Sequence, residues 1–295
     1  MAREEGGEAG VAPFERIAIV GFGLIGASIG LAARARWPSA RLIAVDRKAV
    51  IESAMRRGAA EVGGDDLGLA AEADLIVLAA PVLANIRILP ELQAHVSGSA
   101  VVTDVGSTKR QIGAAAEALP PRLSFIGGHP LAGAAVGGVE AARPDLFAGR
   151  PWILAATDEG SPATARLSSF IQSLGARVHL MTPEVHDLVV AYLSHLPQLT
   201  ASALMQLVGE RTGIDGLALA GRGLSDTTRL ASSPVDIWRD IAATNTDNIG
   251  RAVDELVEIL LRLKAGARED SDPLGTTFAS AAHWKRVLEA GQEKP

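Results

Sequence analysis

The chain has 295 residues, of which 48% are hydrophobic and 21% are charged, as is typical of a globular protein with room for two domains. Its formal net charge of −6 and the lack of a basic cluster argue against nucleic acid as a main partner. It contains no cysteine, which excludes disulfides and thiolate chemistry. Its six histidines show no metal-ligand spacing, so we predict no metal site.

The N-terminal part of the chain is not typical of a signal peptide. Residues 1–15 contain many glycines and glutamates, and we expect them to form a disordered tail. Residues 17–33 are uncharged, but glycines interrupt them and acidic rather than basic residues precede them. We therefore expect a cytoplasmic protein that has no membrane partner.

A glycine-rich segment carries the G-x-G-x-x-G pattern of dinucleotide-binding folds. An apolar run at residues 17–20 predicts a buried strand, the glycines follow at once, and a helical apolar period continues to Leu31. The first glycine allows a tight turn, the second lets a pyrophosphate approach the backbone, and the third lets helix pack against strand. The helix N-terminus offers N–H groups and partial positive charge to phosphates. The predicted phosphate-binding residues are Gly21, Gly23, Leu24, Ile25 and Gly26.

A carboxylate follows the next apolar run at the expected distance. Residues 41–45 predict a strand that ends at Asp46, 20 residues beyond Gly26. A dinucleotide fold places there the acid that accepts hydrogen bonds from the adenosine ribose hydroxyls. An acid would repel a 2′-phosphate and favours NAD, whereas the adjacent Arg47 is compatible with NADP. The alternative is a glycine-rich turn followed by a surface aspartate that binds no ligand.

The rest of the chain divides into an alternating part and a helical part. Further strands are predicted at residues 74–80, 99–104, 123–126, 150–156 and 176–180, with helical periods between them. Such alternation is typical of a mostly parallel sheet covered by helices on both faces. From Pro183 onward the sequence shows only helical periods. They cover residues 184–208, with a kink expected at Pro197, then 235–264 and 278–290.

We therefore predict an α/β fold with two domains. Residues 16–181 would form a Rossmann-type, doubly wound, mostly parallel sheet, and residues 182–295 an all-helical domain that binds substrate and forms a homodimer. Ligands of open parallel sheets bind beyond the carboxyl ends of the strands. Three predicted strands end there in unusual residues, at Pro81, at residues 104–109 and at residues 127–133. We expect Pro81 to contact the cofactor.

Two of these strand ends carry candidate catalytic side chains. Ser107 and Thr108 either cap the following helix or bind a ligand. His129 lies between two glycines and a proline, where core packing rarely places an imidazole. It is either a general base that takes a hydroxyl proton during hydride transfer or a structural histidine bonded to the backbone.

The helical domain supplies a second set of polar candidates. His195 and Gln198 lie one turn apart on one helix face, where His195 either meets a ligand or bonds across helices. Arg229 is suited to bidentate binding of a substrate carboxylate, unless Asp226 holds it in a structural pair. The His-Asp pair at residues 186–187 is expected to cap a helix or to pack.

Five motifs follow one another between about Arg16 and about Lys264. They are Gly21-Phe-Gly-Leu-Ile-Gly26, Asp104-Val-Gly-Ser-Thr-Lys109, Gly128-His-Pro-Leu-Ala-Gly133, Ser194-His-Leu-Pro197 and Asp226-Thr-Thr-Arg229-Leu-Ala. The glycine loop is shared by many families, whereas the two histidine motifs are more specific. In order and spacing the set resembles the prephenate/arogenate (cyclohexadienyl) dehydrogenase family.

The resemblance implies oxidative decarboxylation of prephenate to 4-hydroxyphenylpyruvate, or of arogenate to tyrosine, with reduction of NAD or NADP. It implies that His129 takes the proton of the ring 4-hydroxyl as C4 gives hydride to the nicotinamide, and that Ser107 helps to hold that hydroxyl. It also implies that Arg229 binds a substrate carboxylate and that His195 lies against the substrate. Aromatisation drives the loss of carbon dioxide, so neither a metal nor a covalent nucleophile is required.

The sequence departs from the family pattern at two places. Gln198 replaces the histidine that many relatives carry after the Ser-His-Leu-Pro motif, which leaves the choice between prephenate and arogenate open. Ala134-Ala135 replace a hydroxyl residue and a glutamate, so a gating carboxylate is missing. We also expect no appended regulatory domain, so that any inhibition by tyrosine would act at the active site.

Two alternative functions remain open from the sequence. One is another two-domain dehydrogenase, of the hydroxyacid or imine-reducing kind, that shares only the nucleotide-binding domain. The other is a nucleotide-sensing module without catalysis, in which His129, Arg229 and His195 would not converge on one cleft.

Overall fold

The computed structural model describes residues 11–133, 136–156, 158–266 and 272–292. The chain forms two compact units. The first comprises Met1–Val190 and Ser232–Asn245, and the second comprises Ala191–Ala231 and Thr246–Pro295. The first unit therefore includes two helices, α7 (Pro183–Val190) and α10 (Val235–Thr244), from the region that the sequence predicts to be the helical domain.

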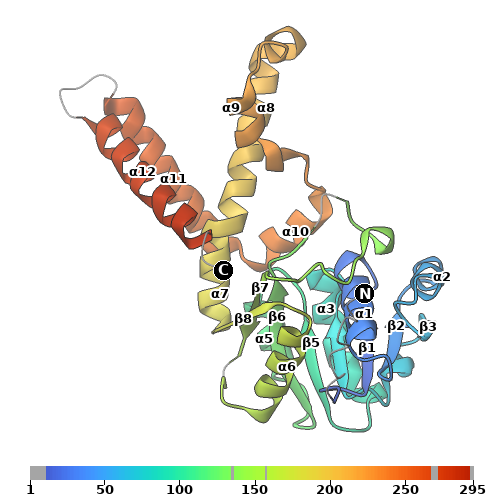
Figure 1. Ribbon diagram of the computed structural model, residues 1–295. Helices are drawn as coiled ribbons and strands as arrows, with labels where there is room; N and C mark the ends of the chain where they lie inside the picture. The colour runs from blue at the N-terminus through green and yellow to red at the C-terminus, as the bar shows by residue number, and fades with distance from the viewer. Residues whose placement is uncertain (1–10, 134–135, 157, 267–271, 293–295) are drawn as a thin grey trace, which may run out of the picture. The chain divides into compact units, whose positions relative to one another are not determined.

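The first unit is built on an eight-stranded sheet with the strand order β3-β2-β1-β4-β5-β6-β7-β8 (Figure 1). All neighbouring strands are parallel except β6 and β7. The order reverses beside β1, as in doubly wound sheets, which confirms the predicted Rossmann-type fold. The strands are β1 (Arg16–Val20), β2 (Arg41–Val45), β3 (Val62–Gly64), β4 (Leu75–Leu78), β5 (Ala100–Asp104), β6 (Leu123–Pro130), β7 (Pro151–Ala155) and β8 (Arg177–Met181).

Helices cover both faces of this sheet because its strands are apolar on both sides. In β1, Ile17 and Ile19 belong to one buried apolar cluster, whereas Ala18 and Val20 belong to another. The first cluster includes side chains of α1, α2 and α6, and the second includes side chains of α4, α5 and the 3-10 turns η1 and η2. These elements are α1 (Leu24–Arg36), α2 (Lys48–Arg56), α4 (Leu92–His95), α5 (Arg110–Ala116), α6 (Pro162–Ser173), η1 (Leu67–Ala70) and η2 (Leu89–Glu91).

Two strands of the first unit differ from the sequence-based expectation. β3 is short and contains two glycines, so it lacks the apolar run that indicates the other strands. β6 continues through Pro130, and its residues from Gly127 onward pair with antiparallel β7. His129 therefore lies on a strand rather than on a loop, which corrects the predicted end of this strand at residue 126. Glycines hid this extension, because they disfavour strands in sequence reasoning.

The described end of the predicted tail is packed against the first unit. The ring of Phe14 is fully buried, and it meets Phe170 of α6 edge to face at a centroid distance of 5.7 Å. The guanidinium of Arg166 lies 4.1 Å from the Phe14 ring centroid, and Asp74 accepts hydrogen bonds from the backbone N–H groups of residues 15 and 16. Residues 11–15 thus differ from the predicted disordered tail. Residues 1–10 lie outside the described residues.

The second unit is helical, as predicted. A π turn, η4 (Ala191–His195), leads into α8 (Leu196–Leu217), in which Gly213 adopts a φ of +63° and interrupts the helix. Pro197 lies in the first turn of α8, where its missing N–H group is tolerated, so the irregularity precedes it. The remaining elements are α9 (Arg222–Thr227), η5 (Arg229–Ser232), α11 (Thr246–Gly266) and α12 (Pro273–Gln292).

The predicted helix over residues 235–264 is two helices. Asn245 separates α10 from α11 with a φ of −138°, and its side-chain amide donates a hydrogen bond to the backbone oxygen of Asp187 at 2.8 Å. Asn245 is fully buried. Tertiary hydrogen bonding at this one residue therefore outweighs a continuous helical period, and it holds α10 in the first unit.

The burial of Phe14 yields a prediction for stability. Phe14→Ala removes a buried ring that contacts Phe170, so we expect the free energy of unfolding to fall by about 3 kcal/mol. Urea unfolding followed by circular dichroism measures this change. Val11→Ala is the control, because Val11 is 97% exposed, and it should leave the midpoint unchanged. Equal midpoints for both variants would show that residues 11–15 do not pack in solution.

Candidate functional site

A cavity of about 450 Å³ opens at the carboxyl ends of the central strands of the first unit. Its wall combines the glycine loop after β1, the segment after β4, the loop after β5 and the end of β6. This is the place where open parallel sheets bind their ligands. The predicted site residues that line it are Gly23, Leu24, Ile25, Pro81, Ser107 and His129.

The glycine loop fits the close approach of a phosphate group. Gly21 has a φ of +92°, and a Cβ there would lie 2.4 Å from the backbone nitrogen of Ala80. A Cβ on Gly26 would lie 2.2 Å from the backbone oxygen of Gly21. A Cβ on Gly23, in contrast, would meet no atom within 4 Å. Gly23 is the N-cap residue of α1 and makes no side-chain cap, so the first N–H groups of this helix are available to an anion.

Asp46 is positioned by the same loop. Its carboxylate accepts hydrogen bonds from the backbone N–H groups of Phe22 and Arg47, each at 2.6 Å. The Asp46 side chain is 18% exposed, whereas that of Arg47 is 89% exposed. A carboxylate has about four acceptor positions, so Asp46 is able to accept further bonds from ribose hydroxyls.

A buried ion pair shapes the loop that carries Ser107. Asp104, at the end of β5, accepts hydrogen bonds from the backbone N–H groups of Gly106 and Gly128, at 2.8 and 3.1 Å. It also pairs with the ammonium group of Lys109. Burial lowers the pKa of Lys109, although the neighbouring Asp104 opposes this effect. The ion pair thereby ties the loop after β5 to β6, next to His129.

His129 lies on β6 opposite Ile153 of β7. The preceding residue must be glycine, because a Cβ on Gly128 would lie 2.4 Å from the backbone oxygen of Asp104. Nδ1 of His129 lies 2.9 Å from Nε2 of His186, a fully buried residue of α7. Nδ1 of His186 in turn lies 2.8 Å from a carboxylate oxygen of Asp187. Three titratable side chains therefore form one chain of hydrogen bonds that begins at the cavity.

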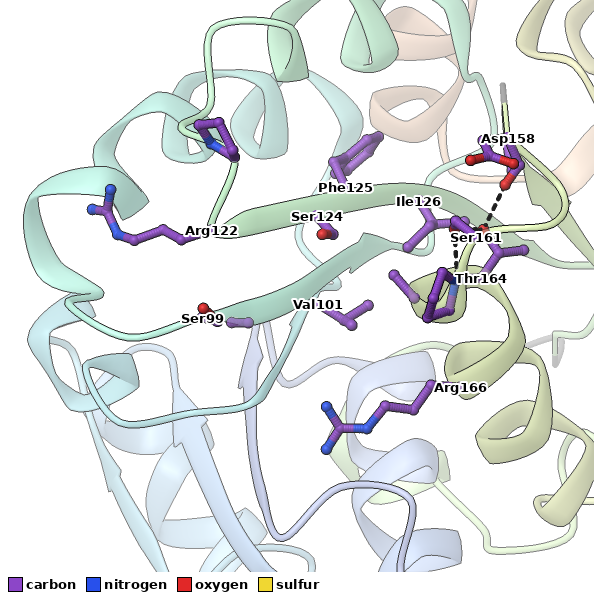
Figure 2. Close-up of a pocket in the computed structure, with 15 residues that line it drawn as sticks. Ser99, Val101, Arg122, Ser124, Phe125, Ile126, Asp158, Ser161, Thr164 and Arg166 are labelled. Carbon is purple, nitrogen blue, oxygen red and sulfur yellow. Dashed lines mark hydrogen bonds between the residues drawn. The ribbon is translucent and has the colours of Figure 1, made fainter.

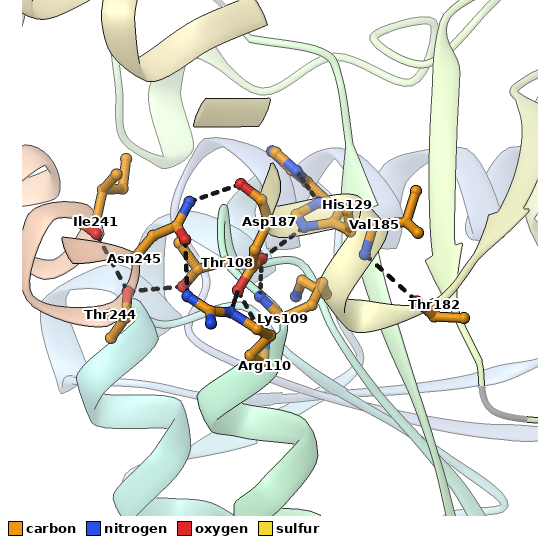
Figure 3. Close-up of polar contacts among 12 residues, drawn as sticks. Thr108, Lys109, Arg110, His129, Thr182, Val185, Asp187, Ile241, Thr244 and Asn245 are labelled. Atoms are coloured by element: carbon orange, nitrogen blue, oxygen red, sulfur yellow. Dashed lines mark hydrogen bonds and ion pairs between the residues drawn. The ribbon is translucent and has the colours of Figure 1, made fainter. Parts of the chain in front are cut away.

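Asp187 anchors this chain to the N-terminus of α5 (Figure 3). Its carboxylate accepts hydrogen bonds from the backbone N–H groups of Lys109 and Arg110, at 2.7 and 3.0 Å. Burial alone would raise the pKa of Asp187, but the bonds from His186 and these two N–H groups outweigh it and keep the pKa below its ordinary value. Burial lowers the pKa of His186.

The link between His186 and His129 was not predicted from the sequence. The sequence predicts that the pair at residues 186–187 caps a helix or packs, and Asp187 does cap α5. The contact of His186 with His129 joins residues 57 positions apart, and sequence spacing gives no signal for it. The one signal in the sequence is a pair of adjacent titratable residues within a largely apolar helical segment.

The remaining candidates belong to the second unit. His195 is buried, and the Gln198 amide donates hydrogen bonds to Ser202 Oγ at 3.2 Å and to the backbone oxygen of Leu230 at 2.8 Å. Arg229 is exposed and lines a hollow of about 400 Å³ together with Asp226. Gln198 therefore holds the backbone beside Arg229. The departure at residues 134–135 lies outside the described residues.

A second hollow of the first unit, about 490 Å³, lies at the amino ends of β5 and β6 (Figure 2). Several of its polar groups bind other parts of the protein. Arg166 donates to the backbone oxygen of Pro13 and to Asp74, Arg122 donates to the backbone oxygen of Val96, and Ser161 caps α6. None of the predicted site residues lines this hollow, in contrast to the cavity at His129.

The described residues bear on metal and membrane binding as well. Within them, no three His, Asp or Glu side chains are grouped so that they could hold a metal ion. One helical stretch, Pro183–Leu217, is long and apolar enough by composition to cross a membrane, but a core helix of a soluble protein passes the same test. This stretch includes the buried, hydrogen-bonded pair His186 and Asp187, which is typical of a protein interior.

Family models match both parts of the chain. One described as "Prephenate dehydrogenase, nucleotide-binding domain" matches residues 29–180, and one described as "Prephenate dehydrogenase, dimerization domain" matches residues 182–279. The prephenate dehydrogenase of Bacillus subtilis is 32% identical over 290 residues, which cover 95% of this chain and 77% of that protein. The cyclohexadienyl dehydrogenase of Zymomonas mobilis is 31% identical, covering 95% of this chain and 98% of that protein.

Solved structures agree with these matches. The arogenate dehydrogenase of Synechocystis is 30% identical with a TM-score of 0.76, covering 95% of this chain and 99% of that one. The prephenate dehydrogenase of Aquifex aeolicus, solved with hydroxyphenyl propionate and NAD+, is 28% identical with a TM-score of 0.84, covering 93% and 98%. With its glycine loop, its strand-borne histidine and matches along both units, the chain belongs to the prephenate dehydrogenase family of oxidoreductases.

Proposed function

We propose that this chain catalyses the NAD-linked oxidative decarboxylation of prephenate to 4-hydroxyphenylpyruvate, of arogenate to tyrosine, or of both, in tyrosine biosynthesis. The observation that carries the proposal is that His129 and Ser107 line the same cavity as the glycine loop. A proton acceptor therefore stands beside the place where a dinucleotide would bind. The names of the relatives from Bacillus subtilis, Zymomonas mobilis and Synechocystis support this substrate class.

NAD is the proposed cofactor. Gly23 leaves room for a pyrophosphate at the N-terminus of α1, and Asp46 offers acceptors to the ribose hydroxyls. Pro81 borders the same cavity, and Arg47 is exposed where a 2′-phosphate would attach, so NADP is the second candidate. Bound NAD would supply the hydride acceptor for C4 of the substrate ring.

The protein's own contribution is orientation and one base. Ser107 would hold the 4-hydroxyl of the ring, and His129 would accept the proton of that hydroxyl as the C–H bond at C4 breaks. The ring carboxylate then leaves as carbon dioxide, and the ring becomes aromatic. Because aromatisation favours the products, no metal or covalent nucleophile is required.

The second unit is proposed to bind the rest of the substrate. Arg229 is exposed on the wall of a hollow and has the planar guanidinium that binds carboxylates. His195 and Gln198 would lie against the substrate, and Gln198 would also fix the backbone at Leu230. A neutral amide at Gln198 is compatible with either substrate side chain.

We further propose a homodimer in the cytoplasm. The second unit exposes large apolar side chains, among them Leu260, Leu261, Phe278 and Trp284 of α11 and α12. Such a surface is typical of an interface, and the family model over this region is described as a dimerization domain.

The base assignment predicts the kinetics of His129→Asn. Asparagine cannot take up the proton, so we expect kcat to fall by about 10²- to 10⁴-fold while KM changes little. Nicotinamide absorbance with each substrate measures both constants. His179→Asn is the matched control, because the exposed His179 lies in the same row of the sheet as His129, across Ile153. An unchanged kcat in His129→Asn would remove the assignment.

The cofactor assignment predicts opposite effects at two neighbouring residues. Asp46→Ala removes a charged acceptor, so KM for NAD should rise by roughly 10- to 100-fold and KM for NADP by less. Arg47→Ala should raise KM for NADP and leave that for NAD unchanged. Steady-state kinetics with both cofactors tests the pair. Equal losses for NAD and NADP in Asp46→Ala would count against the ribose role.

The substrate assignment predicts a binding defect in Arg229→Ala. The loss of a carboxylate partner should raise KM for the substrate by roughly 10- to 100-fold with a smaller effect on kcat. Arg222→Ala is the control, since Arg222 is an exposed arginine of α9 outside the hollow. A pure loss of kcat would contradict the assignment.

A further inference from the structure

The hydrogen-bond chain behind His129 allows its protons to be assigned. The carboxylate of Asp187 is fully buried and accepts from two backbone N–H groups, so it is present as the anion and only accepts. Nδ1 of His186, 2.8 Å away, must therefore carry a proton and donate it. The geometry of this one bond thus places a proton on Nδ1 of His186.

The position of the proton on His129 follows from the charge state of His186. Burial lowers the pKa of His186, and Lys109 acts in the same direction, whereas Asp187 and Asp104 oppose it. The net result is a neutral ring whose proton is on Nδ1, which leaves Nε2 of His186 as an acceptor. Nδ1 of His129 lies 2.9 Å from that acceptor, so it must be the donor.

We propose that His186 and Asp187 are positioning residues that fix neutral His129 as the tautomer with its proton on Nδ1. Nε2 of His129 is then the ring nitrogen without a proton, and it lies on the ring edge opposite the buried His186. This inference rests on the proposed function, because it names the atom that receives the substrate proton. It assigns a role to two residues that do not themselves contact substrate.

The proton balance is simple. As the substrate hydroxyl loses its proton, the O–H bond breaks and an N–H bond forms at Nε2 of His129, which becomes an imidazolium. Its Nδ1–H group still donates to His186, and the negative charge of Asp187 lies one residue beyond. The proton stays on His129 until it passes to solvent, and the Asp187 carboxylate remains ionised throughout.

Titratable groups from several elements surround His186. His129, on β6, lies against the ring of His186, and Asp187 is the next residue of α7. Asp104, at the end of β5, raises the pKa of His186, whereas Lys109, in the following loop, lowers it. Arg110 of α5 donates to Asp187 from the other side through its side-chain Nε at 3.3 Å. With this partner and two N–H groups bound to Asp187, its carboxylate has little tendency to take the proton of His186.

Two substitutions at residue 186 separate positioning from packing. His186→Leu removes the acceptor for Nδ1 of His129, whereas His186→Gln keeps an acceptor in its amide oxygen. We expect kcat of the leucine variant to fall by roughly 10- to 100-fold with KM within about a factor of two, and the glutamine variant to recover most of this loss. His179→Leu, at an exposed site in β8, is the control and should keep its activity.

The pH profile supplies a readout that packing alone would not move. Activity requires neutral His129, so kcat/KM should rise with pH on the acidic side of the pH profile, which we call the acidic limb. Without the acceptor at residue 186 the imidazolium is less stable, so this limb should move to lower pH by about one unit in His186→Leu. It should stay near its original position in His186→Gln. Equal rates and equal profiles for the two variants would overturn the proposal.

Nitrogen NMR of the full chain tests the tautomer without any turnover. With ¹⁵N-labelled histidine, and with the His129 signals identified by their loss in His129→Asn, we expect neutral His129 to carry its proton on Nδ1. A proton on Nε2 would overturn the proposal even if the enzyme is active.

Failure of the proposed function is distinguishable from failure of this inference. If neither substrate is oxidised, the proposed function fails, whereas the spectrum still decides the tautomer. If the leucine variant does not fold, the wild-type spectrum and the glutamine variant decide between the two tautomers.

Discussion

Two buried carboxylates determine the geometry of the candidate site. Asp104 and Asp187 are both fully buried, and a buried carboxylate is tolerated only when hydrogen bonds and opposite charge replace its water. Asp104 receives this compensation from Lys109 and from backbone N–H groups of the loop after β5 and of β6. Asp187 receives it from His186 and from the start of α5. Each carboxylate therefore ties together segments distant in sequence.

These bonds converge on His129 because each carboxylate is linked to it through one intervening residue. Asp104 accepts from the backbone of Gly128, the residue before His129, and Asp187 binds His186, whose ring contacts that of His129. The backbone and the imidazole of His129 are thus held by different partners. The proposed role of His129 as a base requires both constraints, because rotation of either the backbone or the ring would misplace its acceptor nitrogen.

The parts of the site that the sequence predicted are those formed by neighbours in the chain. Gly21, Gly23 and Gly26 lie within one strand-turn-helix segment. The positive φ of Gly21 and the close backbone contact at Gly26 require glycine, whereas Gly23 leaves open space for a ligand. The sequence proposes His129 as a candidate from its own neighbours in the chain. It does not propose His186, because the role of that residue depends on a contact with a residue 57 positions away. Sequence periodicity finds elements, whereas contacts between elements require the fold.

The same distinction explains why one predicted helix is two. Residues 235–264 have a continuous apolar period, but Asn245 forms a buried hydrogen bond with the backbone of Asp187, which ends α10.

This break between α10 and α11 affects the wall of the cavity. Ile237 and Ile241 of α10 line it, and Asp240 accepts a hydrogen bond from the backbone N–H of Leu83 in α3 (Val82–Ile88). The nucleotide-binding unit is therefore not continuous in sequence, because the chain reaches α10 only after it has passed through α8 and α9.

Asp187 provides the junction, since its carboxylate caps α5 while its backbone oxygen accepts a hydrogen bond from Asn245 at the end of α10. The residue that bonds His186 thus also holds a helix of the cavity wall. The position of His186 therefore depends on the carboxylate of Asp187, whereas the junction with α10 depends on its backbone oxygen.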